Sequence, residues 1–310
     1  MQRERLRHMI VIVPGIGGSM LEDKAGTVVW GTRRGVAGTI VDPVRMSIAE
    51  APDLVPVGLL PTMRVVPRFF AVAGYDTLVR QIENTFEGSA GGPVRVDVAR
   101  ADRDPDYGAD VVLFPYDFRL GIARAAARLG AEVERRLGGL TVDARRGRLI
   151  VVGHSMGGLV ARYWLGGLCG ADSPKAGDCA ALITVGTPHR GAPKALHWLV
   201  NGVRVGPRTM KRATAVLREW PSAYELLPRY KAVTTGLPGS DATWPTRYPH
   251  ELPGVGEPGF ADTGPVTRSR CTRPSRRPGR PADRSLRCCR CSPAGTGRWS
   301  GRSWLERVWL

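Results

Sequence analysis

No stretch of this sequence could cross a membrane as a helix, because no run approaches the ~20 apolar residues that a bilayer requires. A targeting segment is also missing. Residues 9–13 are apolar, but they end at Pro14 and are too few for the core of a signal peptide. We therefore expect a cytoplasmic protein, unless translation begins further upstream and adds a leader.

Patterns for metal binding and for disulfide bonding are scarce as well. Four of the six cysteines lie close to the C-terminus, without the paired spacing and nearby histidine of a zinc site. Cys169 and Cys179 flank a short polar loop and could pair in an oxidising compartment, whereas reduced thiols are the alternative elsewhere. We predict that the protein uses no metal and no cofactor.

Acidic residues are few at the C-terminal end, and this shortage explains most of the net charge of +17. Residues 263–310 contain 12 Arg, no Lys and 2 acidic residues, so they carry +10 and leave +7 for residues 1–262. The charge therefore says little about the folded part, and we expect no nucleic-acid partner. Salt-dependent nucleic-acid binding that vanished on deletion of residues 263–310 would contradict this.

The composition of residues 263–310 differs from that of a natural disordered tail, which is poor in Trp and Cys. Three of the eight Trp fall within the last twelve residues. Arg without Lys, mixed with Pro, Gly and Cys, is typical of GC-rich coding sequence read out of frame. Our hypothesis is a frameshift after about Asp262, which resequencing would test, and a native basic tail is the alternative. We predict a folded domain over residues 1–262 and a disordered or out-of-frame tail over residues 263–310.

Apolar strand patterns alternate with helix patterns between residues 9 and 185. This alternation favours an α/β fold with a mostly parallel sheet and helices on both faces. Residues 30–73 are rich in Pro and Gly and form a lid-like excursion after the first strand. The predicted strands span residues 9–13, 109–114, 148–152 and 180–185, and the predicted helices span residues 75–86, 122–137 and 156–165.

The strongest chemical motif is Gly153-His154-Ser155-Met156-Gly157, which lies between a buried strand and a helix. A G-x-S-x-G motif in that setting is a nucleophile elbow, in which the bend lifts the serine hydroxyl above the sheet. The motif predicts an α/β-hydrolase with Ser155 as its nucleophile. His154 is an elbow neighbour in this interpretation, not a catalytic base.

A serine that attacks an ester needs backbone N–H groups to stabilise the negative oxygen that develops. We expect one donor to be Met156, the residue after the nucleophile. The other should come from the loop Pro14-Gly15-Ile16-Gly17-Gly18, with Gly17 as the first choice and Ile16 as the second. The loop matches neither common phosphate-binding pattern, so a nucleotide ligand is not expected.

Together with further motifs, these residues resemble the lecithin:cholesterol acyltransferase-like family of α/β-hydrolases, which includes lipid O-acyltransferases and bacterial lipases. The resemblance covers about residues 9–260. It implies that Ser155 is the nucleophile, that Gly17 and Met156 form the oxyanion hole, and that the excursion corresponds to a membrane-binding and lid region. The matching pieces are Val13-Pro14-Gly15-Ile16-Gly17-Gly18-Ser19, Gly58-Leu59-Leu60, Val65-Val66-Pro67, Gly74-Tyr75-Asp76, Phe114-Pro115-Tyr116-Asp117-Phe118-Arg119, the elbow, Gly186-Thr187-Pro188-His189-Arg190-Gly191 and Tyr224-Glu225-Leu226-Leu227-Pro228.

The excursion also bears on the substrate, because the resemblance implies a lipid or another ester and a possible lipid surface. Five apolar residues of the excursion could meet such a surface, or they could pack in the core. They are Trp30, Leu59, Leu60, Phe69 and Phe70.

The resemblance leaves the catalytic acid and histidine unassigned. In the family the acid lies within a Gly-Asp-Gly-Thr stretch, which is absent here, and no strand pattern precedes His250. Asp117 and Arg119 precede the serine, so an ion pair that clamps a loop suits them better than catalysis, and His189 could line the pocket.

We therefore expect a lipid O-acyltransferase or lipase/esterase whose activity is impaired by loss of the acid and histidine. The alternative is an inactive hydrolase-fold remnant that binds lipid or a partner. Loss of the last strands would also expose an apolar sheet edge, so we expect poor solubility.

Overall fold

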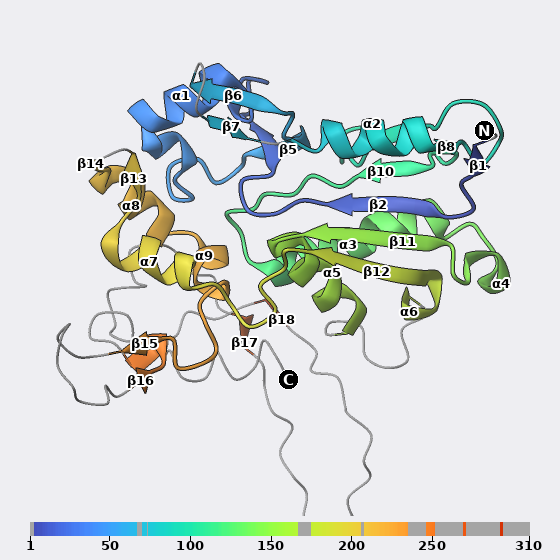
Figure 1. Ribbon diagram of the computed structural model, residues 1–310. Helices are drawn as coiled ribbons and strands as arrows, with labels where there is room; N and C mark the ends of the chain where they lie inside the picture. Colours follow the sequence, from blue (N-terminus) through green and yellow to red (C-terminus); the bar gives the residue numbers. More distant parts are fainter. Residues whose placement is uncertain are drawn as a thin grey trace, which may run out of the picture.

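The computed structural model describes residues 3–66, 70–72, 74–166, 175–205, 208–234, 246–251, 269–270 and 292–293. Its centre is a five-stranded parallel sheet in the order β12-β11-β2-β10-β9. The strands are β2 (Met9–Val13), β9 (Val96–Val98), β10 (Val111–Leu113), β11 (Leu149–His154) and β12 (Cys179–Val185) (Figure 1).

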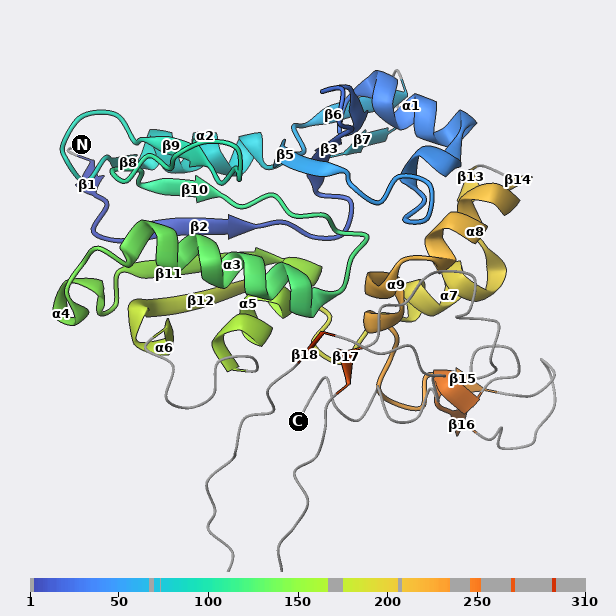
Figure 2. The ribbon, with the colours of Figure 1, turned by 180° about the vertical axis from the view of Figure 1, so that it is seen from behind.

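At the centre of the sheet helices cover both faces, because the β2 strand is apolar at all five positions and fully buried. Alternate side chains of a strand point to opposite faces. Val11 and Val13 of β2 therefore join the core under α3 (Ile122–Leu137) and α5 (Met156–Gly166). Ile10 and Ile12 join the core under α2 (Asp76–Thr85). Figure 2 shows α3 crossing in front of the sheet. The predicted parallel sheet with helices on both faces is confirmed.

The principal strands and helices begin and end within a few residues of their predicted positions. The helix predicted over residues 122–137 spans those residues and ends at Gly138. The helix predicted over residues 75–86 rests on an apolar stripe of Leu78, Ile82 and Phe86, and this stripe was partly wrong for α2, because Leu78 is exposed. Tyr75, Val79, Ile82 and Phe86 pack against the sheet instead, and their spacing follows the 3.6-residue period of the helix.

The excursion contains more regular structure than its Pro- and Gly-rich sequence indicates. A three-stranded antiparallel sheet in the order β4-β3-β5 begins at Ser19, ahead of the predicted start at residue 30. In chain order, α1 and η1 lie between β4 and β5, and the paired strands β6 and β7 follow β5. The elements are β3 (Ser19–Glu22), β4 (Val28–Trp30), α1 (Arg33–Val41), η1 (Pro43–Met46), β5 (Val55–Leu59), β6 (Met63–Val66) and β7 (Phe70–Val72).

Three helices that the sequence did not indicate pack against one another. They are α7 (Pro193–Asn201), α8 (Lys211–Arg218) and α9 (Pro221–Glu225), and one of them, α8, contacts the excursion at η1. Between α8 and α9, the Glu219 carboxylate accepts hydrogen bonds from the Ser47 hydroxyl at 2.7 Å and the Ile48 N–H at 2.8 Å. The Trp220 indole donates to the Met46 carbonyl at 3.0 Å. Excursion and helices lie together beyond the carboxyl ends of the strands (Figures 1 and 2).

The remaining elements are short. They are β1 (Glu4–Arg5), β8 (Phe86–Glu87), α4 (Val142–Arg145), α6 (Lys175–Asp178), β13 (Arg204–Val205), β14 (Arg208–Thr209), β15 (Val233–Thr234), β16 (Thr246–Arg247), η2 (Pro249–Glu251), β17 (Ser269–Arg270) and β18 (Ser292–Pro293). The tail expected over residues 263–310 lies outside the described residues, apart from β17 and β18.

None of the helices in the described ranges has both the length and the apolar character needed to cross a bilayer. Cys179 is a free thiol, and Cys169 lies outside the described residues.

Candidate active site

Ser155 lies at the bend between β11 and α5 and has a φ of 51°. It is the one residue other than glycine with a positive φ among those the structure describes. Non-glycine residues rarely adopt this region, and strain of this kind gathers at functional sites. The backbone therefore runs as strand, sharp bend and helix, as the G-x-S-x-G motif predicts.

The glycines around Ser155 permit close approach of neighbouring backbone. A Cβ atom on Gly157 would lie 2.2 Å from the Val13 carbonyl oxygen, and one on Gly153 would lie 2.5 Å from the Gly158 Cα. Both distances are far below normal contact, so only glycine fits these positions. The elbow is thereby pressed against the end of β2, and the loop after β2 lies next to Ser155.

That loop, residues 14–18, faces the serine directly. A Cβ atom on Gly15 would lie 2.9 Å from the Ser155 Cβ. Gly17 has a φ of 74°, which favours glycine, and its N–H has no hydrogen-bond partner among the described residues. Met156 is the first residue of α5 and is fully buried, and the N–H groups of a helix's first turn have no partner within the helix.

Three aromatic side chains hold the loop in place, each through one hydrogen bond. The Tyr116 hydroxyl donates to the Pro14 carbonyl at 2.7 Å, and the Trp30 indole donates to the Gly17 carbonyl at 2.8 Å. The Tyr75 hydroxyl accepts from the Gly15 N–H at 2.9 Å. The sequence analysis assigned no role to Tyr75 or Tyr116, and it considered Trp30 only for a lipid surface or for the core. Tyr75 and Tyr116 lie in motifs that carry the family resemblance, so a signal was present.

Asp117 and Arg119 form the buried ion pair that the sequence suggested. The Arg119 side chain is fully buried and its Nη2 lies 2.7 Å from Asp117 Oδ2. Its Nη1 donates to the carbonyls of Ser47 and Ala51, at 3.2 Å and 2.8 Å. The interpretation as a clamp is confirmed, because the pair ties the loop after β10 to the excursion.

The three histidines that follow Ser155 have other partners among the described residues. His189 Nε2 lies 3.3 Å from the Thr184 hydroxyl, His197 Nδ1 lies 3.0 Å from the Asn201 amide nitrogen, and the His250 ring stacks on Tyr248. In the described part of the chain, nothing is hydrogen-bonded to the Ser155 hydroxyl. A histidine and an acid paired with Ser155 are therefore not identified.

Glu225, at the end of α9, is a buried acid that the sequence analysis did not single out. Its carboxylate accepts a hydrogen bond of 2.5 Å from the Ile122 N–H, at the start of α3. Burial raises the pKa of Glu225 to about 8, although the hydrogen bond from Ile122 acts in the opposite direction.

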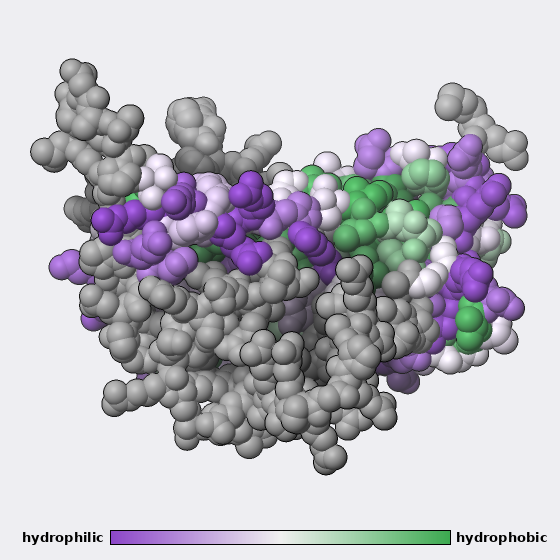
Figure 3. All heavy atoms as spheres, turned by 90° about the horizontal axis from the view of Figure 1, so that it is seen from below, coloured by the Kyte–Doolittle hydropathy of each residue, from purple (hydrophilic) through white to green (hydrophobic). Residues whose placement is uncertain are grey.

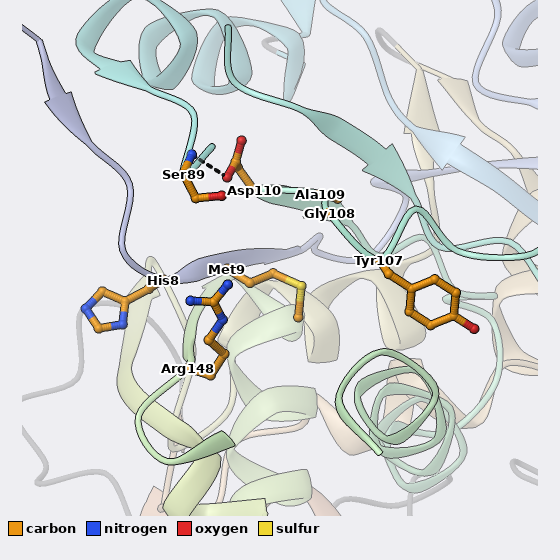
Figure 4. A pocket seen from close by; sticks show the side chains of 8 residues that line it. All are labelled: His8, Met9, Ser89, Tyr107, Gly108, Ala109, Asp110 and Arg148. Atoms are coloured by element: carbon orange, nitrogen blue, oxygen red, sulfur yellow. Dashed lines mark hydrogen bonds between the residues drawn. The ribbon is translucent and has the colours of Figure 1, made fainter. Parts of the chain in front are cut away.

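A polar crevice lies at the opposite edge of the sheet, where β2, β10 and β11 begin (Figure 4). Burial alone would raise the pKa of Asp110, but hydrogen bonds from the N–H groups of Arg95 and Ser89 hold it below its usual value. The crevice is lined by His8, Met9, Ser89, Tyr107, Gly108, Ala109, Asp110 and Arg148. It is remote from Ser155, which follows the carboxyl end of β11.

No group of three or more metal-binding side chains occurs within the described residues.

A parallel sheet with helices on both faces, and a strained serine between a central strand and its helix, place the chain among the α/β-hydrolases. Residues 106–249 match the family model of lecithin:cholesterol acyltransferase, and this part of the chain is similar to that family. The match contains Ser155 and Met156, and it begins after the loop at residues 14–18. A comparison with curated proteins finds no match. The family match supports a lipid acyltransferase- or lipase-like function in general, and hence a lipid or another ester as substrate.

Proposed function

We propose that the protein is a serine-dependent lipid O-acyltransferase or lipase in which Ser155 forms an acyl-enzyme. The observation that carries the proposal is the left-handed backbone of Ser155, at the carboxyl end of β11 and inside the matched segment. A strained serine at that position has little structural use, because glycine would adopt the same conformation without strain.

In the first half-reaction the Ser155 hydroxyl oxygen attacks the carbonyl carbon of an ester. The carbonyl oxygen becomes negative and is stabilised by the N–H groups of Met156 and Gly17. When the intermediate collapses, the bond to the alcohol breaks and the alcohol leaves with a proton. The acyl group stays on Ser155.

In the second half-reaction, water or an alcohol attacks the acyl-enzyme. The products are a carboxylic acid or a new ester, and the proton returns to the Ser155 oxygen. The residues that move these protons are not identified within the described ranges. Their absence from the chain, the frameshift after about Asp262 and the division into residues 1–262 and 263–310 remain predictions.

The excursion supports contact with a lipid surface, but through residues other than those first considered. Leu59 and Leu60 are buried, which favours the core alternative for both. The Trp30 indole packs against Phe118, Phe69 lies outside the described residues, and the side chain of Phe70 is not described. The exposed apolar residues of this region are Ile40, Val41, Val44 and Val55, and Val41 is 82% exposed.

A fluorophosphonate probe tests the proposal, because it reacts with activated serine hydroxyls. We expect the native chain to be labelled and the Ser155→Ala variant to lose the label. Ser89→Ala is a matched control, since Ser89 is an exposed serine at the far end of the sheet, and it should be labelled like the native chain. If native protein is not labelled above a heat-denatured sample, the proposal is wrong, and the inactive remnant becomes the better description.

A further inference from the structure

Tyr75 stands out because its hydroxyl contacts two segments of the candidate site at once. It accepts a hydrogen bond from the Gly15 N–H at 2.9 Å, and it lies 2.8 Å from His154 Nδ1. The Tyr75 and His154 rings also meet edge to face, with centroids 5.8 Å apart. Gly15 lies in the loop that faces Ser155, and His154 is the residue that precedes Ser155. The chain separation is large, since Gly15 and Tyr75 are 60 positions apart in the sequence.

The directions of these bonds follow from the groups involved. A tyrosine hydroxyl has one hydrogen and two lone pairs. It accepts from Gly15, so its own hydrogen is available for His154 Nδ1. Burial raises the pKa of Tyr75, so the tyrosine stays protonated. Partial burial of the imidazole lowers the pKa of His154, so the ring is neutral and its Nδ1 can accept a hydrogen bond from the Tyr75 hydroxyl. In that state His154 carries its hydrogen on Nε2.

The position of Tyr75 is itself fixed by the end of the excursion. Its N–H donates to the Leu60 carbonyl at 2.9 Å. The next residue, Asp76, accepts hydrogen bonds from the Thr62 N–H and hydroxyl at 2.8 Å and 2.7 Å. The ring packs in the core under α2. The Tyr75 hydroxyl is therefore held in a fixed position between the loop and the elbow.

We infer that Tyr75 is a positioning residue, which joins the Gly15 loop to the His154–Ser155 elbow so that the loop's backbone donors stay in register with the Ser155 hydroxyl. This inference rests on the proposed function. Tyr116 and Trp30 also hold the loop, but their hydrogen bonds go to Pro14 and Gly17 and do not reach the elbow. Among these three aromatic residues, only Tyr75 contacts both the Gly15 loop and the His154–Ser155 elbow.

The test compares Tyr75→Phe with the native full-length chain. The variant keeps the ring and removes both hydrogen bonds. We expect the rate constant for fluorophosphonate labelling to fall on the order of 10-fold, which is less than the 10²–10³ lost when an oxyanion donor itself is removed. The probe concentration for half-maximal rate should stay unchanged, because the pocket surface is intact. Tyr107→Phe, which alters an exposed tyrosine remote from the site, should match the native chain in both quantities.

Two variants of His154 separate positioning from a general loss of packing. His154 is exposed, so its replacement should leave the fold intact. His154→Leu removes the acceptor and should slow labelling as much as Tyr75→Phe does. His154→Asn can still accept from the Tyr75 hydroxyl and should label at close to the native rate. If both variants of His154 label like the native chain, the inference is wrong, even if Tyr75→Phe does not fold.

Amide hydrogen exchange at Gly15 provides a readout that does not need a reactive serine. Its N–H loses its acceptor in Tyr75→Phe, so exchange there should accelerate while exchange in β2 stays as it was. The native protein could fail to react with the probe while Tyr75 still protects the Gly15 N–H from exchange. That result would refute the proposed function but would support the link between the loop and the elbow. Equal Gly15 exchange in the native chain and the variant would overturn the inference itself.

Discussion

Two strands of the same sheet, β2 and β12, have similar apolar sequences and very different surroundings. All five residues of β2 are buried, whereas none of the seven residues of β12 is. Ile12 is completely buried, while Ile183 and Val185 are 48% and 50% exposed. Viewed from the β12 side, the surface shows an apolar area beside the segments drawn in grey (Figure 3). An apolar strand sequence therefore specifies a strand without specifying what covers it.

The loops that follow these strands also differ in how well buried contacts hold them in place. Those after β2 and β10 are held by buried groups, among them the Asp117–Arg119 pair and the Tyr116 hydroxyl. After β12, the His189 side chain is exposed, and its hydrogen-bond distances to Arg162 and Thr184 are 3.5 Å and 3.3 Å. The half of the candidate site that contains Ser155 and the proposed backbone donors is thus tightly built. The half that would supply a base is not assembled within the described residues.

The largest expected effect comes from breaking the clamp on the well-packed side. Arg119→Ala removes the charged partner of the buried Asp117 carboxylate and the side-chain donor to the carbonyls of Ser47 and Ala51. Removing one member of a buried pair costs about 3–5 kcal/mol. Denaturant unfolding should show this loss. Lys24→Ala breaks an exposed pair with Asp53 and should leave the unfolding midpoint unchanged. Equal midpoints for the two variants would mean that Arg119 does not clamp the loop.

The comparison between the strands is tested directly by the same substitution in each. Ile12→Ala opens a cavity in the core and should lower the free energy of unfolding by about 2–5 kcal/mol. Ile183→Ala removes a side chain that is already half exposed, so about 1 kcal/mol or less is expected. Both values come from denaturant unfolding of the full chain. A loss at Ile183 as large as that at Ile12 would show that β12 is covered in solution.

A pH-dependent effect, smaller per pH unit than the losses above, is expected from Glu225. Its pKa is raised from 4.5 to about 8 in the folded protein, chiefly by burial. Between these values the folded state binds one proton more than the unfolded state, so stability decreases as pH rises, by up to about 1.4 kcal/mol per pH unit. Glu225→Gln keeps an acceptor for the Ile122 N–H and should remove this slope. Unfolding measured from pH 4.5 to 8 decides the matter, and parallel curves for both proteins would contradict the raised pKa.

The local structure around Ser155 could be predicted from the sequence alone. Apolar strand, glycine-flanked serine and helix follow from patterns confined to residues 148–166, and the strand–helix alternation predicted the parallel sheet. The glycines of the elbow were also readable, because close backbone approach permits no other residue there.

Which distant residues meet at the candidate site could be seen only from the tertiary structure. Tyr75, Trp30 and Tyr116 come from three separate segments, and nothing in their local patterns shows that each bonds to the loop at residues 14–18. Burial also depends on tertiary packing. Leu78 fits the helical stripe but is exposed, and the β12 sequence is apolar like that of β2 although none of its residues is buried. Periodicity records which face of an element is apolar, whereas contacts between segments depend on how the whole chain packs.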